Sequence, residues 1–199
     1  MSITLAELGE AELLSRLARF APPGQLNDDT ALLPPDSRAL LVNTDVMVEG
    51  VHFSDATTAP ADVGWRAVVA NLSDLAASGS EQVEGITVGL VAPGTTSWWW
   101  IEQVYLGISE ALERFGGTLL GGDCSTGNQR LLSISAFGRL GPLRLHRALA
   151  QPGDLLMSSG PHGLSRLGLA FLQDTPLPTA LSIPPSLKEQ AIRSHQRLS

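Results

Sequence analysis

The chain has 199 residues, of which 43% are apolar and 17% are charged. This length fits one ordinary domain, or one domain with part of a second, and the composition excludes a disordered chain. No apolar run reaches the roughly 18 residues of a membrane span and no basic-then-apolar leader opens the sequence, so we expect a cytoplasmic protein that does not contact membranes. The single cysteine, Cys124, excludes an internal disulfide.

The formal net charge is −7, from 13 basic and 20 acidic residues, which argues against nucleic acid as a partner. The only lysine is Lys188, so a Walker-type phosphate loop, which requires Gly-Lys-Ser/Thr, is excluded. If this chain handles phosphates, it has to use metal ions, backbone N–H groups and arginine.

The first elements are predicted by local pattern. Residues 4–20 have apolar positions at helical spacing, and Thr4 with Glu7 has the spacing of a capping box, so we expect one helix. A Pro-Gly break then leads to the acidic run 27–29. Residues 39–45 predict a buried strand that ends on an aspartate.

Helices and strands alternate through the middle of the chain. We expect helices at 62–77, with Asp62 as N-cap, and at 98–115, and strands at 85–91, 118–120 and 131–138. Strands that alternate with helices of this length are typical of a layered α/β (α+β) architecture.

The C-terminal part differs in composition. The chain turns again near 151–154, and a further helix is predicted at 164–173. From Thr175 onward the sequence is Pro-rich and polar. We expect a first domain at 1–141 and the beginning of a second at 142–199.

Acidic residues recur beside apolar elements, where an unpaired charge is costly to bury. They are Asp28-Asp29, Asp45, Asp74 and Asp123. With almost no lysine available, a divalent cation is the natural partner for the set, and hard oxygen ligands suit Mg²⁺. The alternative is that each aspartate caps a helix or turn locally, which explains any single one equally well.

Gly121-Gly122 directly before Asp123 lets the main chain approach a ligand closely. A tight turn is the simpler interpretation of two glycines alone. Beside an aspartate that can hold a metal, the turn becomes a plausible place for nucleotide phosphates.

Other candidates have two interpretations each. Asn71 and Asp74 share one side of a predicted helix, either facing a partner or along a solvated edge. His52 suits a substrate phosphate or a structural contact, and Arg147 a nucleotide phosphate or a surface carboxylate. For Cys124 a role as a small apolar side chain is favoured over that of a nucleophile.

Five motifs carry a resemblance to a known family. They are N-D-D-T-A-L-L at 27–33, N-T-D-V-M-V-E-G-V-H-F at 43–53, N-L-S-D-L-A-A-S-G at 71–79, G-G-D-C-S-T-G at 121–127 and H-R-A-L-A-Q-P-G-D at 146–154. In this order they resemble the thiamine-monophosphate kinases of the PurM-like superfamily. The resemblance implies a PurM-like N-terminal ATP-binding domain, with a mixed sheet covered by helices, and the start of a second domain.

The resemblance also implies an activity. Members of the family phosphorylate thiamine monophosphate to thiamine diphosphate, using ATP and Mg²⁺, by direct in-line transfer between phosphates. It implies a homodimer formed through the first domains. Two alternatives stay open: a non-catalytic nucleotide-binding or dimerisation remnant of the same family, and a related PurM-like synthetase with another phosphate acceptor.

Site residues are carried over by position. The resemblance implies metal ligands at Asp29, Asn43, Thr44, Asp45, Asp74 and Asp123, of which Asp45, Asp74 and Asp123 are also the catalytic set. It implies nucleotide contacts by Tyr105, Gly122, Asp123 and Arg147, and a substrate contact by His52. Two departures from the family pattern stand out: Asn27 replaces the usual glycine, and the S-D-G and G-E-D-Y segments do not occur in residues 1–199.

Overall fold

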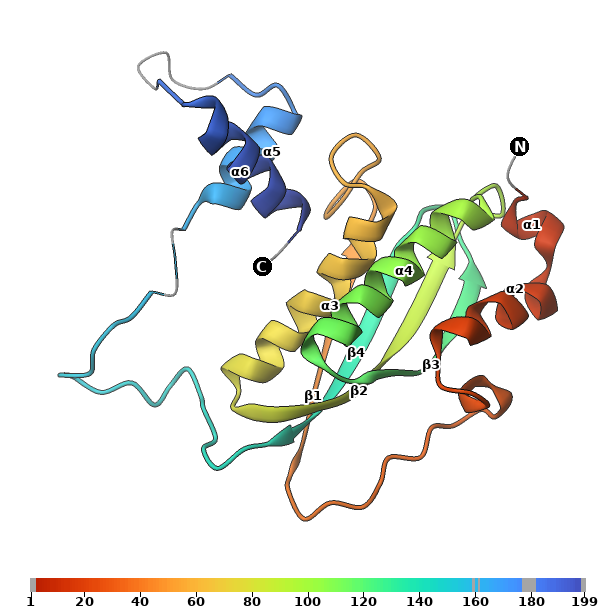
Figure 1. Ribbon diagram of the computed structural model, residues 1–199, viewed down its shortest axis with the longest axis horizontal. Helices are drawn as coiled ribbons and strands as arrows, with labels where there is room; N and C mark the ends of the chain where they lie inside the picture. The colour runs from red at the N-terminus through yellow and green to blue at the C-terminus, as the bar shows by residue number, and fades with distance from the viewer. Residues whose placement is uncertain (1–2, 159, 161, 177–181, 198–199) are drawn as a thin grey trace.

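The computed structural model describes residues 3–158, 160, 162–176 and 182–197 (Figure 1). The helices are α1 (Leu5–Leu8), α2 (Glu10–Leu17), α3 (Pro60–Ala77), α4 (Trp98–Phe115), α5 (Leu164–Leu172) and α6 (Pro185–Gln196), with 3-10 turns η1 (Ala18–Phe20) and η2 (Gln25–Asn27). The strands are β1 (Leu40–Val48), β2 (Ser80–Ala92), β3 (Thr118–Thr126) and β4 (Leu131–Leu140).

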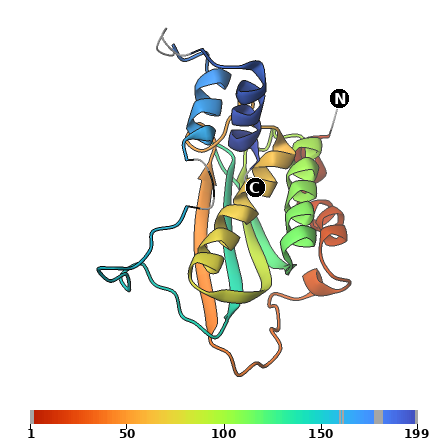
Figure 2. The same ribbon diagram turned by 60° about the vertical axis from the view of Figure 1, so that its left-hand side comes forward.

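The four strands form one mixed sheet in the order β1-β4-β2-β3. β4 pairs antiparallel with both β1 and β2, and β3 pairs parallel with β2. β1 and β3 are therefore the two edge strands. Helices α3 and α4 lie together on one side of the sheet in both views (Figures 1 and 2). This arrangement confirms the predicted mixed sheet covered by helices.

The core lies between the sheet and helices α3 and α4. Alternate residues of β4 point into it, and Leu132, Ile134 and Ala136 are completely buried. The two helices pack backbone to backbone, since a Cβ atom added at Gly64 would lie 1.9 Å from the Val104 carbonyl oxygen. Small residues on these helices thus permit the close packing that gives the sheet its cover.

The other face of the sheet is open in this chain. Val42 and Val46 of β1 are 55% and 41% exposed there. Beside them, the Thr44 and Ser135 hydroxyls lie 2.7 Å apart across the β1–β4 pair. An antiparallel sheet often leaves one face in water, but such a face is then polar, so these valines mark an uncovered surface.

Several predicted boundaries need correction. The N-terminal helix divides into α1 and α2 at Gly9, whose φ of 74° interrupts helical geometry, although the Thr4–Glu7 capping box is present. Helix α3 begins at Pro60 after Ala59, so Asp62 lies in its first turn and is not its N-cap. Strand β3 continues to Thr126, so the predicted Gly-Gly turn is part of a strand.

The C-terminal part forms a helical hairpin in which α5 packs against α6. Helix α6 reaches the first domain through the Arg197 guanidinium, which donates to Asp62 at 2.8 Å. The sequence did not predict α6, because its surface is polar and only Ala191 and His195 are buried. Residues 142–158 are exposed, and the domain boundary at 141 stays a prediction.

None of the helices in the described ranges combines the length and the apolar character needed to cross a bilayer.

Candidate functional site

A pocket of about 340 Å³ lies at the free edge of β3. Helix α2, the middle of α4 and the chain from η2 onward complete its walls. Its apolar lining includes Leu14, Leu17, Leu26, Tyr105 and Leu119. Its acidic lining consists of Glu10, Asp28, Asp29 and Asp123. The pocket thus joins an apolar wall to a cluster of carboxylates.

A β-bulge shapes the wall that β3 contributes. The pairing of β2 with β3 shifts between Ile86 and Thr87, which leaves Leu120 as an extra residue in β3. Beyond the bulge, a Cβ atom at Gly122 would lie 2.0 Å from the Val88 carbonyl oxygen, so only glycine fits there. The strand then presents Asp123 opposite Gly89, away from the core.

The carboxylates of the pocket have little compensation. The Asp28 carboxylate accepts a hydrogen bond from the Asp29 N–H at 2.8 Å, and Asp123 accepts one from the Ser125 hydroxyl at 3.2 Å. No lysine or arginine is among the described residues that line the pocket. Four carboxylates without a cationic side chain give the pocket a negative charge that a hard divalent cation such as Mg²⁺ would neutralise.

Two further groups of the pocket are neutral. Tyr105 is 3% exposed and packs against Phe20 with ring centroids 5.5 Å apart, and burial raises the pKa of its phenol. Burial, reinforced by the negative charges of Asp123 and Glu10, raises the pKa of the Cys124 thiol to about 11. The thiol is therefore protonated at neutral pH, which agrees with its interpretation as a small apolar side chain.

A second group of predicted site residues lies between β1 and α3. Asn71 is completely buried, and its Oδ1 accepts hydrogen bonds from Asn43 Nδ2 at 3.0 Å and from the Asp45 N–H at 3.1 Å. Asp74 follows one turn later on α3 and is exposed. The Asn71 side chain thus has a partner, while Asp74 lies on the exposed part of the same helix.

Asn43 also holds an unsatisfied acceptor. Its Oδ1 is buried and has no hydrogen-bond partner among the described residues. A buried amide oxygen without a donor is costly unless a cation or a donor reaches it. This side-chain oxygen could accept a cation, whereas the resemblance implies that Asn43 binds metal through its main-chain oxygen, so that role stays a prediction.

The remaining predicted residues lie apart from the pocket. Thr44 is on the open face of the sheet. His52 is exposed in the loop after β1, and its Nδ1 accepts a hydrogen bond from the Val48 N–H at 3.1 Å. Arg147 belongs to the exposed segment 142–158 and is not among the pocket's lining residues.

The predicted site residues are consequently divided between two edges of the sheet. Asp29, Tyr105, Gly122 and Asp123 line the pocket at β3, whereas Asn43 and Asp45 lie on β1. Across the ranges that the structure describes, no three His, Cys, Asp or Glu side chains come close enough to hold one metal ion. The carboxylates expected to converge do not converge within one chain.

Sequence reasoning missed Glu10. This residue follows Gly9 and occupies the first turn of α2, where an acidic side chain is common and points to no ligand. Its place in the pocket depends on how α2 packs beside β3, which is a tertiary relationship. The glycine that breaks the N-terminal helix was the only local signal.

Comparison with known proteins identifies the family. Residues 27–140 match the family described as AIR synthase related protein, N-terminal domain. The chain belongs to this family. The family match and the sheet topology together confirm the predicted fold class, which is a PurM-like N-terminal domain with helices over a mixed sheet.

This AIR synthase related chain is also similar to thiamine-monophosphate kinases, as the motifs predicted. It is 56% identical over 192 residues to that of Prochlorococcus marinus and 45% identical over 195 residues to that of Synechococcus elongatus. These matches cover 96% and 97% of the chain and 58% of each relative, so it spans less than two thirds of their length. The structure of AaThiL complexed with AMPPCP and TMP matches all of the chain and 62% of AaThiL, at 30% identity and a TM-score of 0.73.

Proposed function

We propose that this chain supplies the nucleotide-binding part of a thiamine-monophosphate kinase, an enzyme that transfers the γ-phosphoryl group of ATP to thiamine monophosphate. The observation that carries the proposal is the pocket at β3, in which four carboxylates face an apolar wall without a basic side chain. The names of the relatives and the ligands of AaThiL support this choice of substrates.

The pocket is proposed to bind ATP with Mg²⁺. The apolar wall around Tyr105 suits the nucleoside. The phosphates are proposed to lie along the backbone of Gly121 and Gly122, where the space in front of Gly121 is open because a Cβ atom there would meet nothing within 4 Å. Asp29 and Asp123 would hold Mg²⁺, which neutralises the charge of the triphosphate and of the pocket. Without such a cation, the carboxylates would repel the nucleotide.

The second group of residues is proposed to serve the acceptor. Asn43, Thr44, Asp45 and Asp74 would hold further Mg²⁺, and His52 would contact the acceptor phosphate. The attacking oxygen belongs to a phosphate that is already anionic at neutral pH, so these residues align and neutralise groups and need not act as a strong base. Arg147 would reach the nucleotide in the whole protein.

Assembly into a homodimer through the open face of the sheet is part of the proposal. Val42 and Val46 leave apolar surface exposed on that face, and a two-fold dimer is the commonest way to cover such a surface. We also propose that the protein is cytoplasmic and has no membrane partner, as expected from the sequence. A net charge of −7 supports the proposal that it does not bind nucleic acid.

Calorimetry on the purified chain tests the nucleotide site. ATP should bind in the presence of Mg²⁺, and removal of Mg²⁺ should weaken binding at least about tenfold, because the pocket then presents unneutralised carboxylates to the triphosphate. Equal affinity with and without Mg²⁺ would contradict the metal assignment.

A turnover assay separates the kinase from its alternatives. Formation of thiamine diphosphate from thiamine monophosphate and ATP supports the kinase. ATP binding without product selects a non-catalytic nucleotide-binding remnant, and phosphorylation of another acceptor selects a related synthetase.

A further inference from the structure

The segment that carries Asp28 and Asp29 is held at both ends. Before it, the Gln25 side-chain amide donates a hydrogen bond to the Leu120 carbonyl oxygen at 3.0 Å. After it, the Pro34 carbonyl oxygen accepts a hydrogen bond from Arg139 Nη2 at 3.0 Å. The segment that forms the acidic wall of the pocket is therefore hydrogen-bonded to the sheet at two fixed points, to β3 before the aspartates and to β4 after them.

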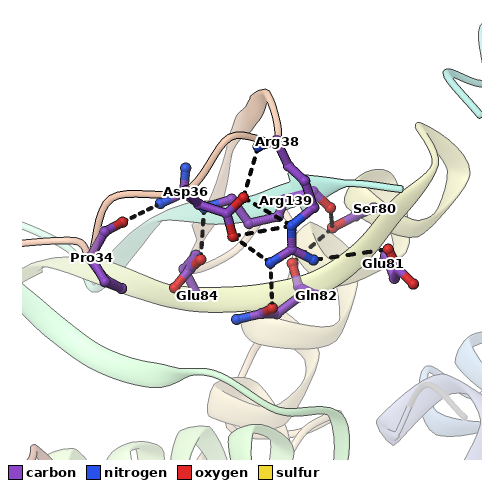
Figure 3. A network of polar contacts seen from close by, with 8 residues as sticks. All are labelled: Pro34, Asp36, Arg38, Ser80, Glu81, Gln82, Glu84 and Arg139. Atoms are coloured by element: carbon purple, nitrogen blue, oxygen red, sulfur yellow. Dashed lines mark hydrogen bonds and ion pairs between the residues drawn. The ribbon is translucent and has the colours of Figure 1, made fainter. Parts of the chain in front are cut away.

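The second fixed point depends on a buried ion pair. Arg139 Nε donates to Glu84 Oε1 at 2.7 Å, and the two side chains are 8% and 9% exposed (Figure 3). A charge-assisted bond of this kind orients the planar guanidinium. While Nε is bound to Glu84, Nη2 of the same guanidinium donates to the Pro34 carbonyl oxygen (Figure 3).

A more exposed pair holds the chain just beyond Pro34. Arg38 Nη2 lies 2.6 Å from Asp36 Oδ2 and donates to Gln82 Oε1 at 2.7 Å (Figure 3). The hydrogen bonds from Arg38 hold the pKa of the Asp36 carboxyl well below its usual range. This pair holds the residues just before β1 in place. It makes no contact with Pro34 among the described hydrogen bonds, so a substitution at Arg38 is a matched control for one at Arg139.

We propose that Arg139, oriented by Glu84, is a positioning residue of the pocket. Its bond to Pro34 divides the segment between η2 and β1 into two parts of about half the length, and it keeps Asp28 and Asp29 against β3. A shorter free segment samples fewer conformations, so its carboxylates are already in place when the nucleotide and its cation arrive. The consequence for ligand binding rests on the proposed function; the anchoring itself does not.

The test uses a double substitution, Arg139→Met with Glu84→Met. Removing both partners leaves no buried unpaired charge, so the fold is expected to survive while the bond to Pro34 is lost. In the free chain, the NMR order parameters of the amides at 28–33, which donate no described backbone–backbone hydrogen bond, should fall below about 0.6, while hydrogen exchange shows that β4 is still protected. The Kd for ATP with Mg²⁺ should rise about tenfold, as expected for one lost hydrogen bond to a charged group.

Arg38→Gln is the control on the same surface. It should leave the order parameters at 28–33 unchanged and the Kd within about twofold, because the Pro34 bond remains. If the double variant loses protection in β4, Arg139→Lys takes its place; it keeps a positive charge opposite Glu84 and should change both readouts in the same direction by a smaller factor.

The outcomes are distinguishable. Unchanged order parameters at 28–33 in a folded double variant overturn the role of Arg139 as an anchor. Lower order parameters with an unchanged Kd overturn the positioning role and leave the nucleotide site standing. Failure of the unsubstituted chain to bind ATP with Mg²⁺ contradicts the proposed function instead, while the order parameters still decide whether Arg139 anchors the segment.

Discussion

Asp45 and Asp123 lie on the two edge strands of one sheet, β1 and β3, with two strands between them. Neighbouring strands are about 4.8 Å apart, so the two edge strands are separated by about 14 Å. A single Mg²⁺ ion, with ligand distances of about 2 Å, does not bridge that gap. Within one chain the two aspartates therefore cannot share one ion, since Asp123 lines the pocket at β3 and Asp45 lies on the opposite edge strand.

Asp123→Asn and Asp45→Asn should separate the proposed roles of the two aspartates. Asp123→Asn removes a charge from the pocket and should raise the Kd for ATP with Mg²⁺ at least about tenfold by calorimetry. Asp45→Asn should leave that Kd within about twofold and should suppress phosphoryl transfer in an active preparation. Glu113→Gln, an equal charge change on an exposed site of α4, is the matched control. An equally large loss of binding in Asp45→Asn would contradict the division into two groups.

The neighbouring glycines of β3 offer a sharper comparison. A Cβ atom at Gly122 would meet the Val88 carbonyl oxygen at 2.0 Å, whereas at Gly121 it would meet nothing within 4 Å. Gly122→Ala should therefore lower the free energy of unfolding by about 1–3 kcal/mol, and Gly121→Ala by less than about 1 kcal/mol. Urea denaturation of both variants measures the difference. Equal stabilities would show that β3 lies less close to β2 than described.

The elements that sequence predicted best are those defined by local signals. Helix α4 spans the predicted residues 98–115, because the Ser97 hydroxyl caps its start and Gly116, with φ of 91°, ends it. Strand β3 was predicted too short because two glycines are typical of a turn. Its continuation is stabilised by pairing with β2, which is distant in sequence.

The residues assigned to the site by resemblance are only partly neighbours in space. Asp29, Tyr105 and Asp123, which the resemblance assigned to metal or nucleotide, line one pocket, and their roles stay predictions. The placement of Asp45 at the opposite edge follows from the strand order, which no local pattern encodes. Glu10 and Arg139 were missed for the same reason, since each reaches its partners only through tertiary packing.

Acidification should loosen helix α6. His195 is 6% exposed, and burial together with the nearby Arg66 lowers its pKa below the ordinary value of 6.5. When α6 detaches, the His195 imidazole regains its ordinary pKa and binds a proton at a higher pH than it does in the docked helix. The docking of α6 is therefore complete above pH 6.5 and weakens as the pH falls toward the lowered pKa. Hydrogen exchange of α6 amides, corrected for intrinsic rates, should accelerate between pH 7 and pH 5. His195→Gln should abolish this response; an identical response in the variant would assign it to another group.

Alkylation of Cys124 should report on the pocket. Because the folded thiol has a pKa of about 11 against 9.0 for the free group, the thiolate at pH 8 is about a hundredfold scarcer in the folded chain than in the unfolded chain. The raised pKa also contributes stability that is present below pH 9 and lost as the pH rises through about 11. Iodoacetamide labelling, followed by mass spectrometry, should be slow at pH 8 and rise about tenfold per pH unit to pH 10. ATP with Mg²⁺ should slow it further, since the thiol lines the same pocket. Labelling at pH 8 as fast as that of the urea-unfolded chain would contradict the burial of Cys124.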